Sequence, residues 1–215
     1  MKIKGAIFDV DGTLIDSMYT WRHRGELYLK KLGIDAREGL QYDVRRLGFL
    51  ESPKLIKEEY NLTQSTDEIL NGMMQVVRDY YINEATLKEG TIEFLDELKK
   101  NGVRMCIATA TDFDMVVPGL KRCGIYDYFE NVFTCGGLNT NKTKPFIFEH
   151  AMESLGTSKD DTVIFEDALY AVKTAKEANF FVTGIFDKQE HEQEEFVPLC
   201  DIFVHDLRDS LKFLL

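Results

Sequence analysis

The sequence predicts an α/β fold in three layers, with helices covering both faces of a mostly parallel sheet and a helical cap inserted after the first strand. Short apolar runs rich in β-forming residues alternate along the chain with segments of helical periodicity, as they do in parallel α/β folds. One long interval near the N-terminus breaks this alternation, because it contains helical patterns and no convincing strand. The alternation predicts the core, and the interruption predicts the cap.

The expected strands are five short apolar runs, over residues 3–10, 103–109, 162–165, 181–186 and 202–204. Continuous apolar character is typical of strands that are buried on both faces. Helices are expected between these runs, over residues 91–100, 146–155 and 168–179. In the first of these helices Ile92, Leu95 and Leu98 share one face. Asn101-Gly102 is a typical helix end, because both residues tolerate the left-handed backbone.

The interval without strands covers residues 17–86 and is expected to fold as a small helical domain. Its helical stretches are expected over residues 19–31, 53–59 and 66–81. Ser52-Pro53 predicts the start of the second stretch, because serine caps helices and proline is tolerated in the first turn. The expected division is therefore a core of residues 1–16 and 87–215 and a cap of residues 17–86, a usual size for a small domain.

The composition is that of a globular protein with an acidic surface, at 44% hydrophobic residues, 29% charged residues and a net charge of -11. Nucleic acid and anionic membranes bind basic surfaces, so neither is an expected partner. No apolar run could span a bilayer, and an acid interrupts the N-terminal run too early for a signal peptide. The four cysteines form no CxxC pair, which fits a reducing cytoplasm. The acidic stretch over residues 189–195 is expected to be a solvated surface segment.

Polar residues end several of the expected strands, where ligands bind in an open parallel sheet. They are Asp9 and Asp11 after the first strand, Thr109 after the second, Glu166 and Asp167 after the 162–165 run, and Lys142 and Lys144 in the loop before that run. Because the carboxyl ends of parallel strands share one edge of the sheet, we expect these side chains to converge there. The expected cluster combines carboxylates, a hydroxyl and a lysine.

Such a cluster of carboxylates predicts a bound cation and phosphate chemistry. Oxygen ligands without histidine or cysteine favour Mg²⁺. With the metal and Lys142 neutralising charge, a phosphate can approach Asp9, which could attack phosphorus and form an aspartyl-phosphate. Asp11 would protonate the leaving oxygen and later deprotonate the attacking water. Gly12 permits a close approach of the backbone beside the phosphate.

The pattern Asp9-x-Asp11-Gly12-Thr13 after a buried strand resembles the signature of the haloacid dehalogenase-like (HAD) superfamily. Thr109, a lysine and the pair Glu166-Asp167 follow in that family's order. The interval between the first two motifs resembles the helical cap of the subgroup that includes β-phosphoglucomutase and phosphoglycolate phosphatase. The resemblance covers essentially the whole chain and implies a Rossmann-like core.

The resemblance also implies roles for the site residues. It implies Mg²⁺ held by Asp9, the Asp11 carbonyl and Asp167, with Glu166 as a partner of these ligands. It implies phosphate contacts from Thr109, Ala110 and a lysine. The segment 141–148 matches the family's lysine motif without a gap if Lys142 is that lysine, whereas Lys144 would need a deletion. We therefore assign Lys142.

The expected function is that of a Mg²⁺-dependent phosphoric monoester hydrolase acting on a small phosphorylated metabolite. A sugar-phosphate mutase resembling β-phosphoglucomutase is the first alternative, although such mutases carry a histidine where Trp21 stands here, with His23 close by. A HAD-like module that binds without turnover is the second, but binding alone does not require both Asp9 and Asp11. Residues 17–86 do not identify the substrate. A monomer is compatible with this design, because the cap can shield the site without a partner.

Overall fold

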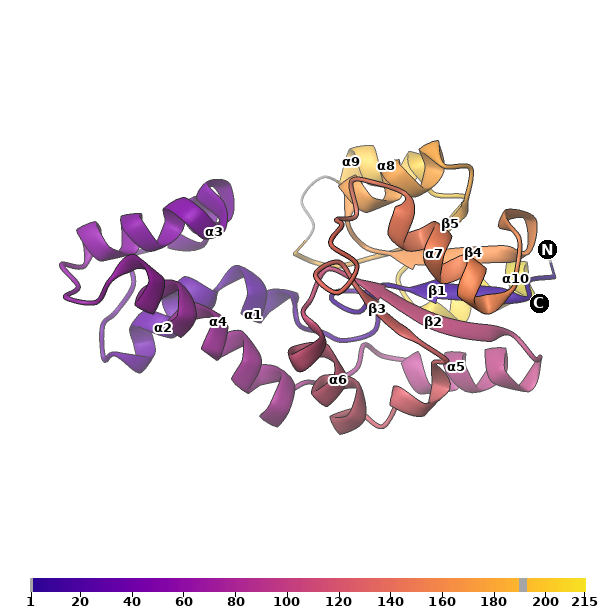
Figure 1. The fold of residues 1–215 in the computed structure, drawn as a ribbon, viewed down its shortest axis with the longest axis horizontal. Helices are drawn as coiled ribbons and strands as arrows, with labels where there is room; N and C mark the ends of the chain where they lie inside the picture. Colours follow the sequence, from indigo (N-terminus) through magenta and orange to yellow (C-terminus); the bar gives the residue numbers. More distant parts are fainter. Residues whose placement is uncertain (1, 190–192) are drawn as a thin grey trace. The chain divides into compact units, whose positions relative to one another are not determined.

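The computed structural model describes residues 2–189 and 193–215, and the chain forms two compact units (Figure 1). The core unit comprises Met1–Asp16 and Ala85–Leu215, and the helical unit comprises Ser17–Glu84. Part of the acidic stretch expected at the surface, residues 190–192, lies outside the described residues. Among the described residues no helix is long and apolar enough to cross a membrane.

The core unit contains a parallel sheet with the strand order β3-β2-β1-β4-β5-β6. The strands are β1 (Gly5–Phe8), β2 (Arg104–Thr109), β3 (Val132–Thr134), β4 (Thr162–Glu166), β5 (Phe181–Ile185) and β6 (Ile202–Val204). In the register of the sheet, Phe8 at the end of β1 lies between Ile107 of β2 and Phe165 of β4. The carboxyl ends of these three strands therefore meet at one edge, and the predicted α/β fold is confirmed.

Helices cover both faces of the sheet, as Figure 1 shows. They are α5 (Thr91–Lys100), α6 (Phe113–Arg122), α7 (Phe146–Leu155), α8 (Leu169–Glu177), α9 (Gln193–Phe196) and α10 (Leu211–Leu214). Successive side chains of β1 point to opposite faces. Ile7 packs in the cluster formed with α7 and α8. Phe8 instead stacks on Phe165, with ring centroids 4.5 Å apart, and meets Phe94 of α5 edge to face.

Strand β3 and the helices α6, α9 and α10 of the core unit were not predicted from the sequence, and α9 and α10 have only four residues each. Strand β3 has only three residues, two of them half-exposed, which is too short to show a periodic pattern. Helix α6 contains Pro118 in its interior, directly after Val116-Val117. β-branched residues followed by proline favour a strand end over a helix, so the sequence signal opposed the observed structure.

The helical unit contains α1 (Met18–Arg22), α2 (Arg24–Lys31), α3 (Leu40–Glu59) and α4 (Thr66–Asn83). The helix predicted over residues 19–31 is interrupted at His23. The helix start predicted at Ser52-Pro53 is wrong, because α3 begins at Leu40 and continues through Pro53. Gly48, with φ 65° and ψ -165°, breaks the helix within α3. Pro53 thus lies five residues after Gly48, in the second helical segment of α3.

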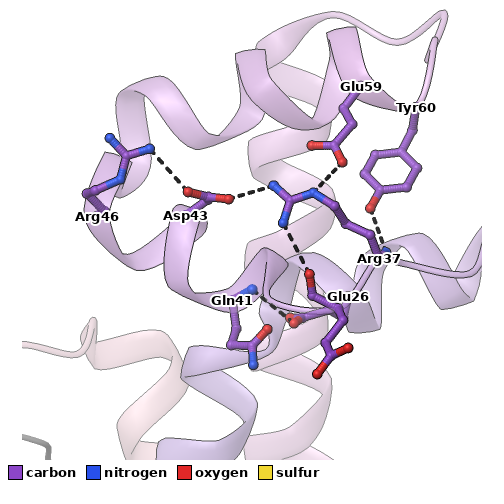
Figure 2. A network of polar contacts seen from close by, with 8 residues as sticks. Glu26, Arg37, Gln41, Asp43, Arg46, Glu59 and Tyr60 are labelled. Atoms are coloured by element: carbon purple, nitrogen blue, oxygen red, sulfur yellow. Dashed lines mark hydrogen bonds and ion pairs between the residues drawn. The ribbon is translucent and has the colours of Figure 1, made fainter.

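A polar network ties the connection before α3 to both ends of that helix (Figure 2). The Arg37 guanidinium donates to Glu59 and to Asp43, each over 2.5 Å, and the Arg37 N–H donates to the Tyr60 hydroxyl over 2.9 Å. Asp43 also accepts from Arg46 over 3.1 Å. Hydrogen bonds from Arg37 and then Arg46 lower the pKa of Asp43. The guanidinium of Arg46 is therefore engaged within the helical unit.

Candidate active site

Three buried carboxylates meet at the carboxyl edge of the sheet. Asp9 follows β1 directly, and its N–H donates to the Phe165 carbonyl of β4 over 3.0 Å. Glu166 ends β4, and Asp167 is the next residue. One carboxylate oxygen from each of Asp9, Glu166 and Asp167 lies within 4.8 Å of the other two. We call these three residues the acidic cluster.

Lys142 lies inside the acidic cluster and is only 2% exposed. Its ammonium donates to an oxygen of Asp9 and, over 2.5 Å, to Oε1 of Glu166. Burial disfavours the charged ammonium, but the charges of Asp9 and Glu166 outweigh burial and raise the pKa of Lys142, which stays protonated. Lys144 is exposed, so the structure places Lys142 at the cluster and leaves Lys144 outside it.

Glu166 fixes the turn after β4. Its Oε2 accepts the backbone N–H groups of Asp167, over 3.0 Å, and Ala168, over 3.1 Å. Burial, together with the charge of Asp9, raises the pKa of Glu166 to about 7, although Lys142 opposes the rise. With both oxygens engaged, Glu166 holds Lys142 on one side and positions Asp167 on the other.

Asp167 is 4% exposed, and its carboxylate accepts no hydrogen bond from the residues that the structure describes. Burial, followed by the charges of Asp9 and Glu166, raises the pKa of Asp167 well above its usual range. A buried carboxylate surrounded by like charges is unfavourable unless a cation accompanies it. Asp167 is therefore the member of the cluster that most needs a positive charge.

The donor set of the acidic cluster fits Mg²⁺. All side-chain donors are carboxylate oxygens, without histidine or cysteine, which is the ligand type that hard divalent cations prefer. Three carboxylates face one lysine, so the ionised cluster would carry more negative than positive charge. A divalent cation would neutralise that excess and would give Asp167 the partner it lacks among the described residues.

The Asp11 carboxylate is not part of the acidic cluster and accepts a hydrogen bond from the segment that follows β2. Its Oδ2 accepts the Thr111 hydroxyl over 2.6 Å. The Thr111 N–H in turn donates to the hydroxyl oxygen of Thr109, over 3.1 Å. Thr109 is buried, while Ala110 between the two threonines is exposed. The segment after β2 therefore places the buried Thr111 beside Asp11 and leaves Ala110 exposed.

Thr111 was not among the residues predicted for the site. The sequence carried a signal, because Thr111 follows Thr109 by two residues at the end of an expected strand. Its contact with Asp11 depends on the pairing of β1 with β2, in which Phe8 lies opposite Ile107. That register is a tertiary property that the sequence pattern alone did not provide.

The family model for haloacid dehalogenase-like hydrolases matches residues 3–179 of the chain. A phosphoglycolate phosphatase from Thiobacillus denitrificans is 28% identical over 163 residues, which are 73% of this chain and 71% of that protein. The structure of a Thermotoga maritima protein assigned as a β-phosphoglucomutase has a TM-score of 0.87 at 20% identity and covers 100% of both chains. YfnB from Bacillus subtilis, assigned as a HAD hydrolase and solved with bound magnesium, has a TM-score of 0.83 at 14% identity, covering 100% of this chain and 99% of that one. At these identities the two structural likenesses concern the fold.

Proposed function

This chain belongs to the haloacid dehalogenase-like hydrolase family, and from that premise we propose that it is a Mg²⁺-dependent phosphatase that hydrolyses a small phosphomonoester through a phosphoryl group on Asp9. One observation carries the proposal: a protonated, buried lysine holds Asp9 inside a cluster of buried carboxylates. The relative from Thiobacillus denitrificans, named a phosphoglycolate phosphatase, supports the same class of reaction.

Asp9 is the proposed nucleophile, because Lys142 engages its Oδ1 and Oδ2 accepts no hydrogen bond from any residue described. Oδ2 would attack phosphorus, so that an O–P bond forms to Asp9 while the bond from phosphorus to the ester oxygen breaks. Water would then attack the phosphoryl group and return Asp9 to its carboxylate. The fixed position of Asp9 serves both steps, because little reorganisation is needed between them.

Asp11 is the proposed general acid and base. It would give a proton to the leaving ester oxygen and would take one from the attacking water in the second step. The hydrogen bond from Thr111 sets the direction of the Asp11 carboxylate. We infer that Thr111 is a positioning residue for this proton transfer, since it contacts Asp11 and was not itself expected to touch the phosphate.

The phosphate would be held by Lys142, Thr109 and the backbone at Ala110. The Thr109 hydroxyl accepts the Thr111 N–H, and its own O–H is a donor that no described residue accepts. Asp9, Asp167 and the Asp11 carbonyl would hold Mg²⁺, with Glu166 beside them. When bound, Mg²⁺ would neutralise negative charge on the phosphate oxygens.

We further propose that residues 17–86, most of which form the helical unit, act as a cap on substrate entry. Nothing in this unit identifies a mutase. Trp21 donates its indole N–H to the Tyr81 hydroxyl over 3.2 Å. His23 stacks on Tyr19 at 4.3 Å and lies 3.4 Å from Glu26. Because both side chains have partners inside the helical unit, the phosphatase is the better supported reading.

The experiment that tests the proposal is phosphate release from a panel of small phosphomonoesters, with Mg²⁺ or with EDTA. We expect release from at least one ester, dependent on Mg²⁺ and saturable in substrate. A parallel assay follows isomerisation of sugar phosphates. Isomerisation without net release would favour the mutase, and silence of the folded protein in both assays would contradict the proposed phosphatase.

The two lysines of the 141–148 segment provide a matched pair of variants. Lys142→Met should lower kcat by roughly 10²- to 10³-fold, the usual effect of removing one donor that stabilises charge developing at the reacting group. Lys144→Met should stay within about twofold of wild type, because Lys144 is exposed and outside the acidic cluster. The measurement is steady-state phosphate release with the best ester of the panel. Equal losses in both variants would contradict the assignment of Lys142.

A further inference from the structure

Lys88, which the sequence analysis did not single out, joins three separate segments of the core unit. Its ammonium donates to the Gly12 carbonyl over 2.5 Å, to the Phe186 carbonyl over 2.6 Å and to Oδ2 of Asp187 over 3.3 Å. An ammonium has three N–H groups, so these acceptors use all of them. The side chains of Lys88 and Asp187 are only 15% and 3% exposed, which makes this a largely buried junction.

The main chain of Lys88 is tied to the same loop as its side chain. Its N–H donates to the Leu14 carbonyl over 2.9 Å, and its carbonyl accepts the Thr91 hydroxyl over 2.8 Å. Gly12 has a φ of 78°, a left-handed conformation that glycine adopts without strain. The loop that turns at Gly12 follows Asp9 and Asp11 directly. Lys88 therefore holds this loop both at its turn, through Gly12, and two residues later, through Leu14.

The junction connects the loop after β1 with the loop after β5. Asp167 follows β4, which lies between β1 and β5 in the sheet. The metal ligands proposed above come from the loops after β1 and β4, so their separation depends on how these neighbouring loops are held. Two of the three acceptors of Lys88 are backbone carbonyls, at Gly12 and Phe186. Lys88 therefore holds the main chain of both loops in addition to pairing with the Asp187 carboxylate.

We propose that Lys88 is a positioning residue for the Mg²⁺ site: it holds the Asp9–Thr13 loop against the loop after β5, so that Asp9 and the Asp11 carbonyl stay at binding distance from Asp167. The proposal rests on the proposed function only in placing Mg²⁺ at the acidic cluster. The charge of Asp187 raises the pKa of Asp167 and that of Lys88 lowers it, which agrees with a location close to the cluster.

Charge and positioning predict opposite signs for the Lys88 variant. Removing a positive charge near the acidic cluster would strengthen Mg²⁺ binding if charge were the only effect. Removing the hydrogen bonds to Gly12 and Phe186 would release the loop and weaken binding. For Asp187→Asn, the loss of a negative charge alone predicts weaker Mg²⁺ binding. Positioning predicts little change, because Lys88 keeps both carbonyl contacts and the loop stays in place.

The test is Mg²⁺ affinity, measured by calorimetry and by the Mg²⁺-induced rise in Tm without any substrate. We expect Lys88→Met to raise the Kd for Mg²⁺ by about 10-fold or more, the usual size of an outer contact of a metal site. Asp187→Asn should stay within about threefold of wild type. Lys188→Met is the matched control, since Lys188 is exposed and lies 4.0 Å from Asp16, and should bind Mg²⁺ as wild type does.

Lys88→Gln provides a second test of the proposal if the Lys88→Met variant does not fold. Glutamine is neutral but still donates N–H groups, so its Kd should lie between those of wild type and Lys88→Met. Unchanged or tighter Mg²⁺ binding by the neutral variants would overturn the proposal, as would a wild type that binds no Mg²⁺. A wild type that binds Mg²⁺ but releases no phosphate would contradict the proposed function, and the affinities would still decide the role of Lys88.

Discussion

Asp9→Asn should abolish phosphate release, lowering kcat by roughly 10⁴-fold or more, the scale at which loss of a nucleophile is measured in other enzymes. An amide cannot accept the phosphoryl group that the proposed mechanism places on Oδ2 of Asp9. The substitution is nearly isosteric, and Lys142 keeps its contact with Glu166, so we expect the variant to fold. The measurements are phosphate release under saturating Mg²⁺ and thermal unfolding of the same preparation.

Asp16→Asn is the matched control for this variant. Asp16 lies at the end of the same loop, its side chain is 44% exposed, and it is not in the acidic cluster. Its activity should stay within about twofold of wild type. Mass spectrometry of acid-quenched wild-type enzyme should find the phosphoryl group on Asp9. An Asp9→Asn variant that retains more than about a hundredth of the activity would show that another group receives the phosphoryl group.

The sequence predicted the acidic cluster because strand ends are visible in a linear pattern. Asp9 and Glu166 each follow an apolar run, and parallel strands bring their ends to one edge. The choice of Lys142 over Lys144 came from motif spacing, and the structure places Lys142 between Asp9 and Glu166. Local pattern and motif order were therefore enough to find the residues that meet at the cluster.

The contacts that hold the site could not be predicted in this way. Thr111 meets Asp11 only through the register of β1 against β2, and Lys88 meets Asp187 across 99 residues of sequence. No local pattern identifies which lysine will find a distant carbonyl. In the helical unit, Ser52-Pro53 indicated a helix start, but α3 begins at Leu40, breaks at Gly48 and continues through Pro53.

Asp167→Asn should raise the stability of the metal-free protein and, at the same time, remove most of its stabilisation by Mg²⁺. The pKa of Asp167 is raised in the folded state, so protonation favours folding. The stability associated with this group is fully present below the unfolded value, about 4, and is lost as the pH rises through the folded value. Asparagine is uncharged at both pH values, whereas Asp167 ionises as the pH rises. The metal-free variant should therefore have a higher Tm than wild type at pH 8 and nearly the same Tm at pH 4.

With Mg²⁺ bound, wild type should have a higher Tm than Asp167→Asn, the reverse of the order expected without metal at pH 8. At 100 times its Kd, a ligand that binds only the folded state adds about 2.7 kcal/mol, which is roughly 5–10 °C in Tm for a chain of this size. Wild type should show this shift, and Asp167→Asn should lose most of it together with phosphate release. Thermal unfolding at pH 4 and pH 8, with EDTA or Mg²⁺, measures all of these effects.

Asp161→Asn is a control in which the pKa shift of the aspartate has the opposite sign. The hydrogen bond from Lys4, followed by that from the Ser158 N–H, lowers the pKa of Asp161 to about 2. Its stabilising effect is therefore present above the unfolded value and is lost as the pH falls through about 2. At pH 8 this variant should lose stability and keep the full Mg²⁺ shift. Asp167 is buried among negative charges, whereas Asp161 lies at the surface beside Lys4. If the cluster binds a cation, the Asp167 carboxylate destabilises the metal-free protein and is required for its stabilisation by Mg²⁺. An Asp167→Asn protein that bound Mg²⁺ like wild type would remove Asp167 from the proposed ligands.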